Sequence, residues 1–262
     1  MSHKIKGIIS DMDGVLYRGS ELIPGAQEFI NRLKDRKIPF LFLTNNSEQT
    51  PLDLKLKLEK RGVKGVETEN FITSAMATAL FLRSQQKGGT VYVIGGGGLI
   101  NELYNAGFSL TETNPDYVIV GKTENFSFEM LKSAVNLIKA GAKFIGTNPD
   151  VIDPVEDGFE PACGTLLSAI ETASGMKPYI VGKPNSLMMT IATKKLGIHA
   201  DDTMMIGDRM DTDIVGGLEA GMKTCLVLSG VTSESELNQY PYKPDLVLPS
   251  IADINLETLE LD

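Results

Sequence analysis

A short apolar run followed at once by two acids marks the beginning of the chain, within Lys6–Tyr17 (K-G-I-I-S-D-M-D-G-V-L-Y). The run ends with Gly7–Ser10 and does not alternate with polar residues, which is typical of a strand buried on both faces of a parallel sheet. Asp11, Asp13 and Gly14 follow it directly. Because like charges raise each other's pKa, the two acids are unfavourable neighbours unless a cation such as Mg²⁺ binds them. Taken alone, these residues fit a solvated acidic turn equally well.

Length and charge narrow the classes of function. With 262 residues the chain is long enough for one large domain or two, and 42% hydrophobic and 23% charged residues are typical of a soluble globular protein. The net charge of −9 argues against a nucleic acid polymer as partner, because such binding needs clustered Lys and Arg. A phosphorylated metabolite remains compatible with this charge, since a metal and one lysine supply positive charge locally.

Cysteine content and the N-terminal residues indicate a location. Only Cys163 and Cys225 are present, too few for a disulfide framework or a four-cysteine zinc site, so a reducing compartment is expected. The N-terminus (M-S-H-K-I-K) lacks the apolar core of a signal peptide. No apolar run approaches the roughly 18 residues of a membrane span. We therefore expect a cytoplasmic protein without a membrane partner.

Periodicity predicts alternating strands and helices in the first third of the chain. Expected strands are 7–10, 39–43 and 71–73, and expected helices are 26–37, 52–58 and 74–84. The segment 52–58 (L-D-L-K-L-K-L) alternates as a strand would. We nevertheless predict a helix there, because Thr50 suits the N-cap, Pro51 the first helical position and Asp53 the third.

The middle and last thirds continue the alternation. Lys87 to Gly89 is expected to be a linker, followed by strands 91–94, 117–120 and 143–146 and helices 99–105, 127–140 and 164–174. This order favours a layered α/β module. The last third returns to the first pattern, with expected strands 179–181, 203–206, 224–228 and 246–248, a helix after residue 185 and a helix at 214–220.

Four of the expected strand ends carry polar residues. They are Asp11 with Asp13, Thr44 with Asn45, Lys183, and Asp208 with Asp213. The carboxyl ends of strands form the ligand crevice of an open parallel sheet. One such ending is weak evidence, whereas four with complementary chemistry are hard to assign to chance.

The side chains at these ends match the needs of phosphoryl transfer. One carboxylate can attack phosphorus, and a second can protonate the leaving oxygen and later activate water. A hydroxyl, an amide and a lysine can hold the phosphoryl oxygens while Mg²⁺ neutralises their charge.

The same motifs resemble those of the haloacid dehalogenase (HAD) superfamily of phosphatases over the whole chain. They read Asp11-Met-Asp13-Gly-Val-Leu, Thr44-Asn-Asn-Ser, Lys183-Pro184, and Gly207-Asp208 with Asp213 five residues later. Two further motifs, Phe144-Ile-Gly-Thr-Asn-Pro-Asp150 and Pro161-Ala-Cys-Gly-Thr165, look like the NagD-like branch with a C2-type cap. In combination the motifs are far more specific than any one of them.

The resemblance implies a fold and its domains. It implies an α/β protein with a doubly wound, parallel-sheet (Rossmann-like) HAD core and an inserted α/β cap. We predict core residues 1–84, cap residues 85–178 and core residues 179–262. The spacing agrees, because 32 residues separate Asp11 from Thr44, whereas 138 separate Thr44 from Lys183, far more than a crossover needs.

The resemblance also implies roles for the acids. Asp11 would be the nucleophile and a ligand of the Mg²⁺ cofactor. Asp13 would be the general acid and base, and would bind the metal through its backbone carbonyl. Asp208 would bind the metal directly, with Asp213 as an outer contact. The presence of Asp13 favours phosphate ester chemistry, because dehalogenating members of the superfamily lack a second acid at this place.

The remaining implied site residues bind phosphate or substrate. Thr44, Asn45 and Lys183 would hold the phosphoryl group, with Asn46 as a secondary residue. Cap residues expected near substrate are Thr147, Asn148, Asp150, Cys163 and Gly164. The implied function is a Mg²⁺-dependent phosphatase of small phosphomonoesters, with nucleotide monophosphates, sugar phosphates and phosphoglycolate as candidate substrates.

Three other functions fit parts of the sequence less well. A phosphoacceptor signalling switch of the receiver type also combines acids, a Thr, a Lys and Mg²⁺, but Asp13 and the cap argue against it. A phosphomutase would share the nucleophile, and the cap position weighs against it. Gly95–Gly98 invites a dinucleotide-binding interpretation, but the G-x-G-x-x-G spacing fails because residue 100 is Ile. The oligomeric state stays open.

Overall fold

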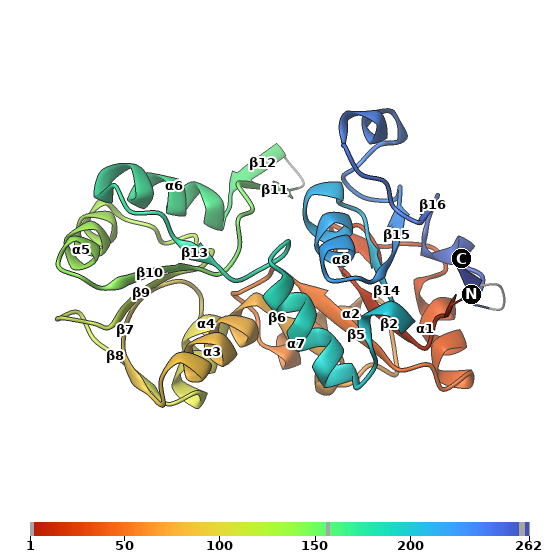
Figure 1. The fold of residues 1–262 in the computed structure, drawn as a ribbon, viewed down its shortest axis with the longest axis horizontal. Helices are drawn as coiled ribbons and strands as arrows, with labels where there is room; N and C mark the ends of the chain where they lie inside the picture. The colour runs from red at the N-terminus through yellow and green to blue at the C-terminus, as the bar shows by residue number, and fades with distance from the viewer. Residues whose placement is uncertain (1–2, 156–157, 257–259, 262) are drawn as a thin grey trace. The chain divides into compact units, whose positions relative to one another are not determined.

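The computed structural model describes residues 3–155, 158–256 and 260–261 (Figure 1). By internal contacts the chain forms two compact units. Unit 1 consists of Met1–Thr44, Pro51–Ile72 and Lys183–Asp262, and unit 2 consists of Asn45–Thr50 and Thr73–Gly182. The predicted helix 74–84 and strand 179–181 thus group with unit 2, while the domain boundaries themselves remain a prediction.

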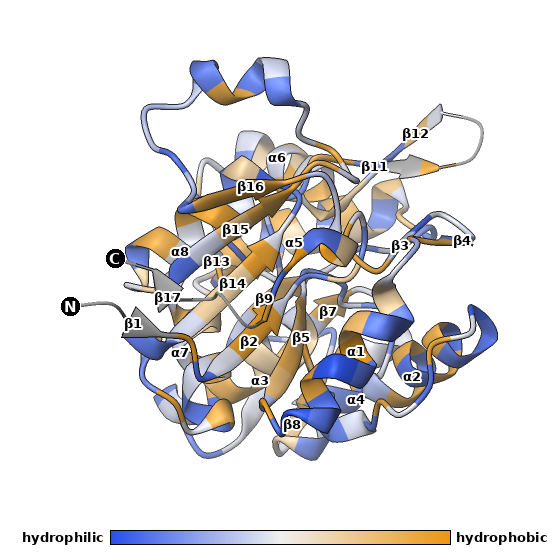
Figure 2. Ribbon diagram, turned by 90° about the vertical axis from the view of Figure 1, so that its right-hand side faces the viewer, coloured by the Kyte–Doolittle hydropathy of each residue, from blue (hydrophilic) through white to orange (hydrophobic). Residues whose placement is uncertain are grey.

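A six-stranded sheet forms the centre of unit 1, in the order β16-β15-β14-β2-β5-β6. The strands are β2 (Gly7–Ser10), β5 (Phe40–Thr44), β6 (Phe71–Thr73), β14 (Thr203–Gly207), β15 (Lys223–Val227) and β16 (Leu246–Leu248). The pairings from β16 through β5 are parallel. The strand order runs outward from the centre in both directions, through β2, β5 and β6 on one side and through β14, β15 and β16 on the other, so the sheet is doubly wound, as predicted. Figure 2 shows β2, β5, β14, β15 and β16 as predominantly hydrophobic.

Helices and small two-stranded pairs complete unit 1. The helices are α1 (Ala26–Asp35), α2 (Pro51–Lys60), α7 (Ser186–Leu196) and α8 (Val215–Glu219), the last preceded by a π-helical turn at Met210–Ile214. The short pairs are β1 (His3–Lys4) with β17 (Glu260–Leu261) and β3 (Tyr17–Arg18) with β4 (Glu21–Leu22). Single 3-10 turns occupy Thr68–Asn70, Ala200–Asp202, Glu234–Gln239 and Ile251–Asp253. Across the described ranges, no helix is long and apolar enough to span a membrane.

The helix predicted over the alternating segment 52–58 is confirmed. In α2 the side chains of Leu54 and Leu58, four residues apart, are buried, whereas Leu52 and Leu56 are exposed. Residues i and i+4 share a helix face, so this burial is the helical solution to an alternating sequence. The segment is therefore an amphipathic helix despite its alternating sequence.

A five-stranded parallel sheet forms the centre of unit 2, in the order β13-β10-β9-β7-β8. The strands are β7 (Gly89–Ile94), β8 (Phe108–Leu110), β9 (Tyr117–Val120), β10 (Lys143–Gly146) and β13 (Tyr179–Ile180). The helices are α3 (Ser74–Gln85), α4 (Gly97–Asn105), α5 (Phe128–Lys139) and α6 (Cys163–Ser174). An antiparallel hairpin pairs β11 (Ile152–Val155) with β12 (Gly158–Pro161) and leads directly into α6.

Two predictions about the last strand of the insertion are wrong. The strand expected at 179–181 was assigned to the second part of the core, but β13 pairs with β10 in the sheet of unit 2. Gly182 continues this attachment, because its N–H donates to the carbonyl of Thr147 at 2.8 Å. Lys183 is therefore the first residue of unit 1 after the insertion and does not end a core strand.

Other differences arise where the local pattern is weak. The expected linker at residues 87–89 runs into β7, which begins at Gly89. β8 and the hairpin β11–β12 were not predicted, because most of their described side chains are exposed and give no buried period. The expected helix 214–220 begins as the π-helical turn and ends at Glu219.

Candidate active site

Three aspartates gather at the carboxyl ends of two neighbouring strands of unit 1. Asp11 follows β2, Asp208 follows β14, and Asp213 lies in the π-helical turn behind β14. The parallel pairing of β2 with β14 brings the first two together, and the N–H of Asp11 donates to the carbonyl of Ile206 at 2.8 Å. One carboxylate oxygen from each aspartate lies within 4.8 Å of the others, and all three side chains are buried.

Lys183 supplies the positive charge of this cluster. Its Nζ lies 3.0 Å from Oδ1 of Asp11 and 2.6 Å from Oδ1 of Asp213, and the residue is only 1% exposed. The backbone N–H of Arg209 donates to the other oxygen of Asp213 at 3.2 Å. One lysine thus faces a group of three buried acids.

Burial and mutual repulsion determine how these groups titrate. Burial raises the pKa of Asp11, although Lys183 and the N–H of Met12 oppose this shift. Burial, together with the charges of Asp213 and Asp11, raises the pKa of Asp208 well above its ordinary value. Burial raises the pKa of Asp213 to about 6. Burial disfavours the charged form of Lys183, but Asp11 and Asp213 outweigh it and raise its pKa.

The donor set fits a divalent metal ion. Three carboxylates and one ammonium group leave excess negative charge in a buried place, which is costly without a further cation. Carboxylate oxygens are the ligands that hard divalent cations prefer. The buried cluster of Asp11, Asp208 and Asp213 could therefore bind such an ion.

Two glycines enclose the carboxylate of Asp208. A side chain at Gly14 or at Gly230 would collide with this carboxylate, and Gly14 also has a φ of +73°, which favours glycine. The N–H of Val231 donates to Oδ2 of Asp208 at 2.7 Å, and the hydroxyl of Ser229 donates to the carbonyl of Gly14 at 2.7 Å.

Sequence reasoning missed this contribution of residues 229–231. The segment follows β15, the neighbour of β14, so the rule applied to the other strand ends would have found it. Residues 229–231 contain no acidic side chain, however, so nothing in their sequence indicated a contact with a metal-binding carboxylate.

Asp13 differs from Asp11 in its surroundings. Asp13 is exposed, whereas Asp11 is buried. A backbone bridge links Asp13 to Tyr17, and the N–H of Gly14 donates to the carbonyl of Tyr17 at 2.8 Å. Burial and then the charge of Asp13 raise the pKa of Tyr17. Asp11 therefore lies in a buried environment and Asp13 in a solvent-exposed one.

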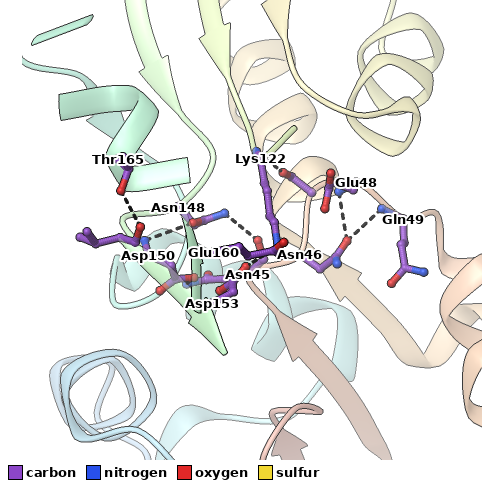
Figure 3. A network of polar contacts seen from close by, with 12 residues as sticks. Asn45, Asn46, Glu48, Gln49, Lys122, Asn148, Asp150, Asp153, Glu160 and Thr165 are labelled. Atoms are coloured by element: carbon purple, nitrogen blue, oxygen red, sulfur yellow. Dashed lines mark hydrogen bonds and ion pairs between the residues drawn. The ribbon is translucent and has the colours of Figure 1, made fainter. Parts of the chain in front are cut away.

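The Thr44–Asn45–Asn46 motif lies where the chain leaves β5. Thr44 is the last residue of β5, and Asn45 begins unit 2. The side-chain amide of Asn45 donates to Oδ2 of Asp150 at 3.0 Å (Figure 3). Oδ1 of Asn46 accepts from the N–H groups of Glu48 and Gln49 at 3.0 and 2.9 Å, so this side chain shapes the loop.

The predicted cap residues surround the root of the hairpin β11–β12. Thr147 and Cys163 are fully buried, with Oγ1 and Sγ 3.5 Å apart, and burial raises the pKa of the thiol. Asn148 is almost fully buried, and Asp150 accepts the N–H of Gly164 on its carbonyl at 2.7 Å. The structure brings these five residues together, and their contact with substrate remains a prediction.

Two family models match the chain. The haloacid dehalogenase-like hydrolase model matches residues 8–109, and the HAD-hydrolase-like model matches residues 180–254. The matched residues include both strand ends that carry Asp11 and Asp208, together with Thr44 and Lys183.

Full-length relatives agree with the family models. The chain is 48% identical to a dihydroxyacetone phosphatase of Corynebacterium glutamicum, over 94% of this chain and 89% of that protein. It is 44% identical to the ribonucleotide monophosphatase NagD of Escherichia coli, over 96% and 99% of the two chains. The solved structure of that NagD superposes with a TM-score of 0.91, covering 97% of this chain and 99% of the other.

A further relative is named for a third class of phosphorylated substrate. An acid sugar phosphatase of Staphylococcus haemolyticus is 38% identical over 98% of this chain and 97% of its own length. Fold, identity over nearly the full length and the family models thus lead to the same group of hydrolases. The chain belongs to the haloacid dehalogenase superfamily, as a NagD-like phosphomonoesterase.

Proposed function

We propose that the protein is a Mg²⁺-dependent phosphatase that hydrolyses small phosphomonoesters through an aspartyl-phosphate intermediate. The observation that carries this proposal is the pairing of Asp11 with Lys183 inside a buried acidic cluster, beside the exposed Asp13. A buried, rigidly held carboxylate suits in-line attack, and an exposed one suits exchange of protons with water.

In the first step an oxygen of Asp11 attacks phosphorus. The bond between phosphorus and the ester oxygen breaks as the bond to Asp11 forms, and protonated Asp13 donates its proton to the leaving alcohol. Lys183 stabilises the charge on Asp11 and on the phosphoryl oxygens, because its Nζ already lies 3.0 Å from Oδ1 of Asp11.

In the second step water replaces Asp11 on phosphorus. Asp13 accepts a proton from the water molecule as the water oxygen bonds to phosphorus, and the bond to Asp11 breaks. Inorganic phosphate leaves, and the enzyme returns to its starting state. Thr44 and Asn45 hold the phosphoryl oxygens through both steps, as their place at the carboxyl end of β5 supports.

The residues that would hold the metal are Asp11 and Asp208 by their side chains and Asp13 by its carbonyl, with Asp213 nearby. When bound, Mg²⁺ neutralises charge on the phosphoryl oxygens. Carboxylate and carbonyl oxygens are the ligands Mg²⁺ prefers, which supports this ion over softer metals.

The substrates we propose are small metabolites with one phosphoryl ester. The names of the relatives, a dihydroxyacetone phosphatase, a ribonucleotide monophosphatase and an acid sugar phosphatase, share the phosphoryl group and differ in the leaving group. We therefore propose triose and sugar phosphates and nucleotide monophosphates as the substrates to test first, with phosphoglycolate included.

A phosphate-release screen tests the proposal. Purified protein is incubated with a panel of these esters and with p-nitrophenyl phosphate, in parallel with Mg²⁺ and with EDTA. Release that needs Mg²⁺ and that disappears in Asp11→Asn is the expected result. Absence of release with Mg²⁺ from every ester contradicts the proposal. A stable phosphoprotein without turnover favours the receiver-type switch instead.

A further inference from the structure

Asn45 is the first residue of unit 2, and it contacts residues next to two other points at which the chain passes from one unit to the other. It follows Thr44 at the first crossing, and its carbonyl accepts the hydroxyl of Ser74, just after the crossing at Ile72, at 2.7 Å. Gly182, just before the crossing to Lys183, packs so closely against Oδ1 of Asn45 that a side chain would not fit there. Asn45 is therefore fixed on several sides.

Two further hydrogen bonds to Asn45 come from residues that precede the hairpin β11–β12. The side-chain amide of Asn148 donates to the carbonyl of Asn45 at 2.8 Å, and the amide of Asn45 donates to Oδ2 of Asp150 at 3.0 Å (Figure 3). The N–H of Asp150 in turn donates to Oδ1 of Asn148 at 3.2 Å. Asn148 and Asp150 thus hold the backbone and the side chain of Asn45 together.

Asn148 has its polar atoms engaged inside the protein. Its amide also lies 3.3 Å from Oγ1 of Thr147, its Oδ1 accepts from Asp150, and the residue is only 4% exposed. Breaking these contacts to bind a substrate would leave buried polar groups unsatisfied, which is costly. The arrangement therefore favours a role toward Asn45 over a role toward the leaving group.

We propose that Asn148 and Asp150 are positioning residues that hold Asn45 in place for the phosphoryl group. This inference rests on the proposed function, in which Asn45 binds phosphoryl oxygens. It replaces the expectation that these two residues contact the variable part of the substrate. The acceptor on Asp150 is a carboxylate, and a hydrogen bond to a charged acceptor orients an amide more strongly than one to a neutral acceptor.

The two roles differ in how a substitution affects different substrates. Every substrate carries the same phosphoryl group, so displacement of Asn45 reduces activity by the same factor for all of them. Loss of a contact to the leaving group reduces activity by a factor that depends on the leaving group. Comparing two esters therefore separates positioning from substrate contact.

The experiment measures Asp150→Ala on p-nitrophenyl phosphate and on the best natural ester of the screen. We expect kcat/KM to fall about 10- to 100-fold for both esters by a common factor, because a charge-assisted bond and a catalytic orientation are lost. Inhibition by inorganic phosphate should weaken in parallel. Asp150→Asn, which keeps an acceptor oxygen, should restore part of the activity and serves as the test if Asp150→Ala does not fold.

Asp153→Asn is the matched control. Asp153 lies in β11, three residues after Asp150, and pairs with Lys122 at 2.6 Å. Its replacement should leave kcat/KM within about a factor of three, as for a substitution away from the reacting groups. The double variant Asn45→Ala/Asp150→Ala is the second control. Its kcat/KM should be little lower than that of Asn45→Ala alone, because Asp150 then has no amide left to position.

Two results overturn the proposal. One is an unchanged kcat/KM in Asp150→Ala, and the other is a loss that differs more than about tenfold between the two esters. If the wild type hydrolyses no ester, the proposed function fails. The inference about Asn45 is then tested by the rise in Tm that inorganic phosphate with Mg²⁺ causes in the wild type and in Asp150→Ala. A smaller rise in Asp150→Ala supports the inference, and an equal rise, or none in the wild type, contradicts it.

Discussion

The ammonium group of Lys183 lies 2.6 Å from Oδ1 of Asp213, a side chain with no exposed surface. The same nitrogen lies 3.0 Å from Oδ1 of Asp11. Asp213 thus holds the lysine at a fixed distance from the acid that we propose as nucleophile. Two carboxylates share one positive charge, so substitution of any of the three residues changes the charge that the others experience.

Asp11→Asn should separate activity from stability. Phosphate release should fall on the order of 10⁴-fold or more, as when the nucleophile of a covalent mechanism is removed. In EDTA the Tm should rise, because burial disfavours the charged form of Asp11 and asparagine carries no charge. Phosphate assays and thermal melts check both parts. Near-normal turnover in this variant would exclude the covalent mechanism.

Lys183→Met should destabilise the fold as well as abolish activity. The change leaves three buried acids without their cation, and removing one partner of a buried ion pair costs about 3–5 kcal/mol. Urea unfolding in EDTA measures the loss. Lys132→Met is the control, because Lys132 pairs with Glu129 on the surface, and such pairs contribute about 1 kcal/mol or less. Equal losses in the two variants would contradict the prediction.

Stability of the metal-free protein should depend on pH through Asp213. Burial raises the pKa of Asp213 from an ordinary 3.8 to about 6, so the folded protein binds this proton more tightly than the unfolded chain. The associated stability is present below about pH 4 and is lost as the pH rises through about 6. In EDTA the Tm should therefore fall between pH 4 and pH 7.

Added Mg²⁺ should oppose this loss, because ionised carboxylates bind the cation better and binding releases protons. The rise in Tm on adding Mg²⁺ should thus be larger at pH 7.5 than at pH 5, on either side of the pKa of about 6. Asp213→Asn should flatten the dependence in EDTA. A rise in Tm that is independent of pH would argue against metal binding at this cluster.

Gly230→Ala should weaken metal binding with little effect elsewhere. The added methyl group would meet the carboxylate of Asp208 and force it to move. Because misplaced ligands reduce metal affinity, the Mg²⁺ concentration for half-maximal activity should rise about tenfold or more. Gly97→Ala, whose methyl group would enter open space, is the matched control. Unchanged Mg²⁺ dependence in Gly230→Ala would contradict this account of Asp208.

Lys122→Met should loosen the hairpin β11–β12. Lys122 binds Asp153 on one strand and Glu160 on the other, and these contacts raise its pKa despite burial (Figure 3). Hydrogen exchange should become faster at the described hairpin residues and stay unchanged in α5, which lies elsewhere in unit 2. Unchanged exchange in the hairpin would show that its backbone pairing alone holds it.

The sequence was sufficient to predict the fold class and to place Asp11 and Asp208 at the carboxyl ends of two strands. Asp11 and Asp208 were predictable because β2 and β14 are continuous buried runs, and parallel neighbours end at the same edge. Lys183 was expected at the same edge as Asp11 and lies 3.0 Å from it, but the strand before Lys183 was assigned to the wrong sheet. A two-residue strand carries too little pattern to specify its partner, which tertiary packing decides.

The environment of each residue could not be read from the sequence. The D-x-D spacing does not reveal that Asp11 is buried and Asp13 exposed, because burial depends on elements far along the chain. The attachment of Asn45 to Asp150 joins residues 105 positions apart, and no local period reports such a pair. The glycine contacts around Asp208 escaped for the same reason.

The hairpin β11–β12 has its two ends close together. The N–H of Ala162 donates to the carbonyl of Val151 at 2.9 Å, so the residue before β11 and the residue after β12 are hydrogen-bonded neighbours. A segment with adjacent ends can be exchanged as a cassette, in the way that antibody loops are varied on a constant framework. If Asn148 and Asp150 are kept, exchange of this hairpin leaves their hydrogen bonds to Asn45 in place, because all three residues lie outside the exchanged segment.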